Sequence, residues 1–139
     1  MSDIGTVLRT LLANGRFQEF LAMELLAHDS AAGTVTIKLP WKPEFERGPG
    51  TEQWHGGLIA SLIDIAGDFA LITQLGQAIP TINLRIDYLR PAIKTDLVAT
   101  GRVLRAGKSI GTVDIDVSDD SGKVVAVGRG TYSTLVPGR

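Results

Sequence analysis

The chain of 139 residues contains no cysteine, and it has only two histidines, His28 and His55. Without cysteine, the chain cannot form disulfides, thiolate zinc sites, iron–sulfur clusters or a cysteine nucleophile. Two histidines are too few for a polyhistidine metal site within one chain, so we expect no bound metal. Carboxylates and backbone amides remain as the groups that this sequence offers for chemistry.

An excess of charge of one sign is also absent, because the formal net charge is -1. No basic field is therefore expected to attract nucleic acid or an anionic membrane surface. The most apolar stretch, residues 58–75, carries Asp64 and Asp68 near its middle, which a membrane span would not normally tolerate. The N-terminus lacks the basic start and apolar run of a secretory signal. These features predict a cytoplasmic protein without nucleic-acid or membrane partners.

The composition is that of one globular domain over residues 1–139, with 44% apolar and 21% charged residues. Helical spacing predicts a short helix over residues 2–14, capped by Ser2 or Asp3, and a long helix over residues 55–75 that Gly76 ends. Alternating apolar residues predict strands over residues 34–39, 81–89, 97–105, 111–118 and 123–135, with residues 21–26 as the hairpin partner of the first. We therefore expect an α+β fold, with an antiparallel sheet of five to six strands beside the long helix.

The long helix is apolar around most of its circumference but carries two carboxylates. A helix of this kind is buried on all sides, and because one sheet cannot cover it, we expect a second copy of the chain to pack against it. Asp64 and Asp68 lie four residues apart on one face, where like charges oppose the helix by about 0.2–0.5 kcal/mol and burial adds a larger cost. Either this face is functional, or it meets water or a cation such as Arg85.

The same helix begins with His55-Gly56-Gly57. Glycine lets a ligand approach the backbone, and the first-turn amides lie unpaired at the positive end of the helix dipole. Such a helix start can hold a carbonyl oxygen that becomes an oxyanion, although the glycines can also serve only as the turn into the helix. Gly56 and Asp64 are eight residues apart, or about 12 Å along a helix, so one chain cannot apply both to one carbonyl. Two copies with antiparallel long helices would bring Gly56 of one beside Asp64 of the other.

At these residues the sequence resembles the PaaI-type acyl-CoA thioesterases of the hotdog-fold superfamily. Residues 55–64 read HGGLIASLID, with the acid at the family's spacing from the histidine. Residues 87–92, DYLRPA, and Gly107-Lys108 followed by Gly111 are also similar to segments of that family. The resemblance implies a hotdog fold, in which a curved antiparallel sheet wraps the long helix. It also implies a homodimer, often paired further into a tetramer.

The resemblance further implies hydrolysis of an acyl-CoA thioester, with the CoA ester as substrate and no cofactor. In this family the amide of Gly56 would polarise the thioester carbonyl at the helix start that His55 and Gly57 help to form. Asp64 from the facing subunit would act as nucleophile or as general base on water, and His55 is either a structural hydrogen-bonding residue or a direct participant. The residues expected to bind the phosphates of CoA lie at turns near the matched motifs: Arg90, Arg105, Lys108 and Ser109.

The chain departs from the family pattern at two positions. Related enzymes often carry Asn or Gln six residues before the histidine, where this chain has Pro49, and Gln53 or Glu52 are the candidates to replace it. Asp68 stands where relatives often have a small or hydroxylated residue. A carboxylate there would either favour base chemistry at Asp64 or pair with water or arginine. The change at position 49 motivates an alternative function, a hotdog module that binds acyl-CoA or another acyl ligand without turnover. A hotdog dehydratase or isomerase ranks last, because the motifs of those enzymes are not found.

Overall fold

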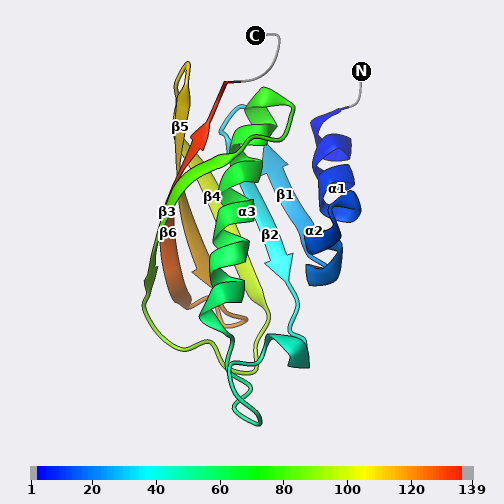
Figure 1. Ribbon diagram of the computed structural model, residues 1–139, viewed down its shortest axis with the longest axis vertical. Helices are drawn as coiled ribbons and strands as arrows, with labels where there is room; N and C mark the ends of the chain where they lie inside the picture. Colours follow the sequence, from blue (N-terminus) through cyan, green and yellow to red (C-terminus); the bar gives the residue numbers. More distant parts are fainter. Residues whose placement is uncertain (1–2, 136–139) are drawn as a thin grey trace.

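The computed structural model describes residues 3–135, in which one antiparallel sheet curves around a long helix (Figure 1). The six strands lie in the order β1-β2-β4-β5-β6-β3, and all neighbours are antiparallel, so β1 and β3 are the edge strands. This arrangement confirms the α+β architecture expected from the sequence. The elements in chain order are α1 (Ile4–Asn14), α2 (Arg16–Leu21), β1 (Glu24–Asp29), β2 (Thr34–Leu39), the 3-10 helix η1 (Pro43–Phe45), α3 (Gly56–Leu75), β3 (Thr81–Tyr88), β4 (Leu97–Ala106), β5 (Ile110–Ser118) and β6 (Val124–Ser133).

Helix α3 begins and ends where the sequence signals place its termini. His55 is the N-cap residue, because its side chain accepts a hydrogen bond from the backbone N–H of Gly57. Gly76 ends the helix with a φ of 79°, a left-handed conformation that glycine adopts without strain. The predicted boundaries of the functional helix are therefore confirmed.

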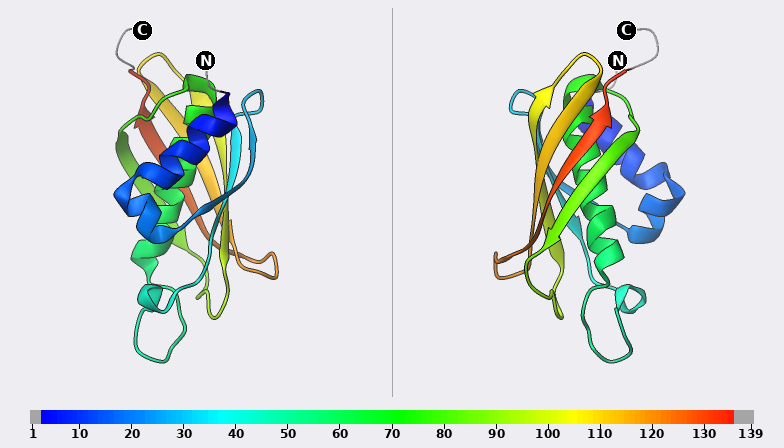
Figure 2. Two further views of the ribbon diagram at one scale, coloured as in Figure 1. Left: turned by 90° about the vertical axis from the view of Figure 1, so that its right-hand side faces the viewer. Right: turned by 60° about the vertical axis from the view of Figure 1, so that its left-hand side comes forward.

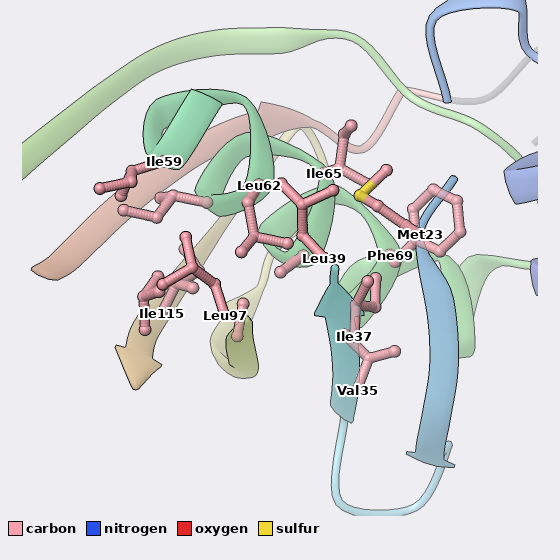
Figure 3. Packing of buried hydrophobic residues seen from close by; sticks show 14 of the residues in the cluster. Met23, Val35, Ile37, Leu39, Ile59, Leu62, Ile65, Phe69, Leu97 and Ile115 are labelled. Atoms are coloured by element: carbon pink, nitrogen blue, oxygen red, sulfur yellow. The ribbon is translucent and has the colours of Figure 1, made fainter. Parts of the chain in front are cut away.

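The concave face of the sheet holds α3 and forms the hydrophobic core. Leu62 of α3 lies over Leu39 and Leu97 of the sheet, and all three side chains are fully buried (Figure 3). Strand β4 approaches the helix so closely that a Cβ atom on Gly101 would lie 2.6 Å from the carbonyl oxygen of Ala66. Only glycine permits this approach, and it fixes the position of α3 against the sheet.

The side of α3 that faces away from the sheet is covered by α1 and α2 of the same chain (Figure 2). Within α3, only Gly57 and Gln74 are exposed. The prediction that α3 needs a second copy of the chain for its burial is therefore wrong. It fails because the pattern does not show that the predicted N-terminal helix packs back on α3, and because α2, with six residues, is too short to show the periodicity that predicts a helix. Although α3 is long and apolar enough to cross a membrane, most of it is buried, as in the core helix of a soluble domain.

The N-terminal region differs from the sequence prediction in one further respect. The hairpin partner of β2 begins at Glu24 rather than at residue 21, because Leu21 is the last residue of α2. Ala22 then ends that helix in the left-handed conformation, with a φ of 55°. Asp3 caps α1 as expected, while Ser2 lies outside the described residues.

Candidate active site

The first turn of α3 leaves the backbone amide of Gly56 without a partner among the described residues. Gly57 N–H donates to His55 Nδ1 at 2.9 Å, and Leu58 N–H donates to the His55 carbonyl oxygen at 3.0 Å. Among residues 3–135, the N–H of Gly56 has no hydrogen-bond acceptor. Because Nδ1 of His55 accepts, a neutral His55 ring carries its proton on Nε2. This geometry fits the structural alternative for His55 and leaves the Gly56 amide for an external oxygen.

The end of β3 supports the helix start through a residue that sequence reasoning missed. The hydroxyl of Tyr88 donates to the carbonyl oxygen of Gly56 at 2.7 Å. A Cβ atom on Gly56 would lie 3.3 Å from the Tyr88 ring, so the tyrosine packs directly on this glycine. No local signal marks Tyr88 as a site residue, because the contact depends on how β3 folds beside α3.

The loop before α3 is anchored in the core. Trp54 is buried and stacks on Phe45, with 5.3 Å between the ring centroids. The indole N–H of Trp54 donates to the carbonyl oxygen of Thr95 at 2.8 Å. Because the next residue is the N-cap His55, this packing holds the helix start in place.

A cavity of about 500 Å³ opens beside the Gly56 amide. Gln53 borders it, so a side-chain amide is present there despite Pro49, whereas Glu52 does not line it. Arg90 also lines the cavity, as does Arg47, which no sequence motif marked as a site residue. Its lining residues are Arg47, Gln53, Trp54, Gly56, Gly57, Ile59, Tyr88, Leu89, Arg90, Pro91 and Ala92.

Asp64 faces a second, smaller cavity of about 210 Å³. Its Oδ1 accepts a hydrogen bond from the hydroxyl of Thr81 at 2.7 Å, and its backbone carbonyl accepts one from the hydroxyl of Tyr132 at 2.9 Å. Arg85, proposed as a neutralising cation, lies instead 3.5 Å from Asp87 and does not pair with Asp64. Residues of α2 and α3 line this cavity: Phe17, Gln18, Ser61, Asp64, Ile65 and Asp68.

Asp68 lies one turn beyond Asp64 in the same cavity. Its Oδ1 is buried and has no hydrogen-bond partner among the described residues. Burial, and secondly the charge of Asp64, raise the pKa of Asp68 from 3.8 to about 7. Burial also raises the pKa of the Tyr132 hydroxyl, with a smaller contribution from Asp64. Within residues 3–135, no group of three His, Asp or Glu side chains is placed to hold a metal ion.

The predicted site residues do not all meet within one chain. The cavity at Gly56 and the cavity at Asp64 have no lining residue in common. Arg105, Lys108 and Ser109 lie at the β4–β5 hairpin, at the end of the molecule opposite the start of α3 (Figure 1). Of the four residues expected to bind CoA, only Arg90 borders the cavity at Gly56.

Known proteins share both this sequence pattern and this architecture. The family model of the thioesterase superfamily matches residues 53–126, more than half of the chain. The chain belongs to the thioesterase superfamily. This thioesterase-superfamily domain is 30% identical to human acyl-coenzyme A thioesterase 13, over 90% of this chain and 89% of that protein. It is 32% identical to acyl-coenzyme A thioesterase PaaI of Escherichia coli, over 79% of this chain and 76% of that protein.

Solved structures agree with the family assignment. A protein from the thioesterase superfamily matches this domain with a TM-score of 0.90 and 30% identity, over 96% of this chain and 100% of that one. The E. coli PaaI structure matches with a TM-score of 0.85 and 26% identity, over 96% of this chain and 94% of that one. The PaaI-type hotdog fold expected from the sequence is thus confirmed.

Proposed function

We propose that this domain hydrolyses acyl-CoA thioesters in a site that two copies of the chain share. The separation of two groups on α3 is the observation that carries the proposal. The unpaired amide of Gly56 borders one cavity and Asp64 borders another, about 12 Å further along the helix. An antiparallel pair of α3 helices would bring the amide of one copy to the acid of the other. The names of the human and E. coli relatives support acyl-CoA as the substrate class.

The open edge of β3 supports a homodimer. Within residues 3–135, β3 pairs only with β6, so the outer backbone groups of this edge strand are available to pair with a second copy in a two-fold arrangement. We further propose that two such dimers associate, that the protein works in the cytoplasm without nucleic-acid or membrane partners, and that it needs no cofactor beyond its CoA-ester substrate.

In the reaction, water adds to the thioester carbonyl carbon, the carbon–sulfur bond breaks, and a carboxylic acid and the CoA thiol are released. The Gly56 amide stabilises the negative charge that develops on the carbonyl oxygen. Asp64 either takes the proton of the attacking water and returns it to sulfur, or attacks the carbonyl itself to form an anhydride that water then hydrolyses. Arg47 and Arg90 give the cavity at Gly56 a positive charge that suits the phosphates of CoA.

The first test measures thiol release from a panel of aryl and aliphatic acyl-CoA esters. We expect hydrolysis by the wild type and at least about a hundredfold loss of kcat in Asp64→Ala and Asp64→Asn, with circular dichroism unchanged. Asp116→Asn is the control, because this carboxylate is exposed on β5. Unchanged hydrolysis in the Asp64 variants would refute the assignment, and tight binding of CoA esters without thiol release would favour the acyl-binding module.

The second test asks whether two chains share the site. Asp64→Asn and Gly56→Val should each be inactive alone, because each destroys one half of every site. After unfolding and refolding as an equal mixture, about half of the dimers are mixed, and each has one intact site of its two, so about a quarter of wild-type activity should return. A mixture that stays inactive, while a refolded wild type recovers, would refute the shared site.

A further inference from the structure

Asp68 is a carboxyl group that the chemistry above leaves unused, although it lies one helical turn from Asp64. Both side chains border the same cavity, which is closed on the α2 side by Phe17 and Gln18. The two carboxyls differ in their contacts. Asp64 Oδ1 accepts the hydroxyl hydrogen of Thr81, whereas Asp68 Oδ1 is buried without a partner among the described residues. A buried carboxyl oxygen without a partner has a hydrogen bond still to be satisfied, and Asp68 is one of the residues that line this cavity.

No described cation neutralises this pair of acids. Two titratable groups lie near Asp68: the carboxyl of Asp64 on α3 and the buried hydroxyl of Tyr132 on β6. α2 contributes only the uncharged Phe17 and Gln18 to the cavity. The segment before β3 contributes a backbone N–H, at Ile79. Two negative charges in so small a cavity are unfavourable, so one carboxyl keeps its proton, and burial selects Asp68.

We propose that Asp68 is a positioning residue whose protonated carboxyl donates a hydrogen bond to the attacking water and so holds that water beside the Asp64 carboxylate. The inference rests on the proposed thioester hydrolysis, with Asp64 acting as general base. Asp64 accepts a proton from the water, and Asp68 keeps its own proton throughout, so the stoichiometry of the reaction is unchanged. The role requires the acid form of Asp68, and an Asp68 carboxylate would repel Asp64 and offer the water no donor.

The pH dependence of kcat tests this role. We expect wild-type kcat to fall about tenfold per pH unit above roughly pH 7, where Asp68 loses its proton. Asp68→Asn keeps a donor and cannot ionise, so it should remain active and lose this alkaline decline. Asp68→Ala should lower kcat at pH 6 about tenfold with KM changed less than about twofold. Asp116→Asn, on the outward side of β5, should retain the wild-type profile. An unchanged alkaline decline in Asp68→Asn, or wild-type kcat in Asp68→Ala, would overturn the proposal.

A measurement without substrate separates this inference from the proposed function. Infrared difference spectra at pH 6 should show a protonated carboxyl in the wild type that is missing in the folded Asp68→Asn variant. If this signal is absent from the wild type, the role of Asp68 is refuted even when acyl-CoA esters are hydrolysed. If the signal is present but no ester of the panel is hydrolysed, the proposed function fails, and the positioning role fails with it.

Discussion

Replacing Asp68 by asparagine should stabilise the fold, and the gain should grow with pH. Burial and the nearby Asp64 raise the pKa of Asp68 from 3.8 to about 7. Below about pH 4 the folded and unfolded chains both hold the proton, so the group has little effect on stability. Between about pH 4 and pH 7 the unfolded chain releases it and the folded chain does not, so the free energy of unfolding falls as pH rises. Above about pH 7 both forms are ionised and the loss is constant.

The size of this loss follows from the two pKa values. Each tenfold change in proton affinity is worth about 1.4 kcal/mol, so ionising Asp68 in the fold costs about 4 kcal/mol. Asparagine has a similar shape and carries no charge at any pH. The difference in unfolding free energy between Asp68→Asn and the wild type should therefore increase by about 4 kcal/mol between pH 4 and pH 8.

Urea unfolding at pH 4, 6 and 8, at one protein concentration, measures this difference. Equal concentrations are needed because a dimer's stability depends on the amount of protein. Asp116→Asn serves as the control, since it removes an exposed carboxylate of β5. A stability difference between Asp68→Asn and the wild type that is the same at pH 4 and pH 8 would show that Asp68 ionises normally in the fold.

Two other contacts give sharp predictions. Tyr88→Phe removes the hydroxyl that donates to the carbonyl oxygen of Gly56 at 2.7 Å. It should lower kcat/KM about fivefold with little change in the free energy of unfolding. Wild-type kinetics in this variant would refute a supporting role for Tyr88. Gly67→Ala would place a Cβ atom 2.1 Å from the Tyr132 hydroxyl oxygen, so urea unfolding should show a loss of about 1–3 kcal/mol despite the better helix propensity of alanine. Tyr132→Phe in the same chain should recover part of that loss, and a Gly67→Ala variant as stable as the wild type would refute the close packing.

The parts of the fold that the sequence predicted well are those with a local signal. Helix α3 has a capping histidine, a long apolar run and a terminal Gly76. Each of these signals can be recognised from neighbouring residues in the sequence. The strands show alternation, so their existence followed from the pattern, whereas the position of β3 at the sheet edge beside β6 did not. Helix α2 shows neither signal, because six residues make fewer than two turns and depend on tertiary packing. The packing of α1 on α3 has no local signal either, and so the sequence led to the wrong conclusion that α3 needed a second chain for its burial.

The residues of the candidate site likewise fall into those with a local sequence signal and those without one. Gly56 and Asp64 were selected because both lie on one predicted helix, where the spacing alone fixes their separation. Thr81 and Tyr88 contact these residues from the two ends of β3, at sequence separations of 17 and 32 residues. Neither contact could be predicted, since it depends on where β3 lies relative to α3. The four residues expected to bind CoA do not meet within one chain for a related reason, because nearness to a motif in the sequence does not imply nearness in space.

The surroundings of Gly56 and Asp64 on α3 have a consequence for catalysis. Asp64 accepts hydrogen bonds from Thr81 and Tyr132 of its own chain. In the proposed dimer, the carbonyl that Asp64 serves is held by the Gly56 amide of the other copy, whose support by Tyr88 is equally internal. In each shared site the proton chemistry of the acid and the placement of the carbonyl are thus set by separate groups that belong to different copies of the chain. Changes at Asp68 should therefore alter the pH dependence of kcat. Changes at Tyr88 should lower kcat/KM by the same factor at every pH. In the double variant, the two effects on the activation free energy should add.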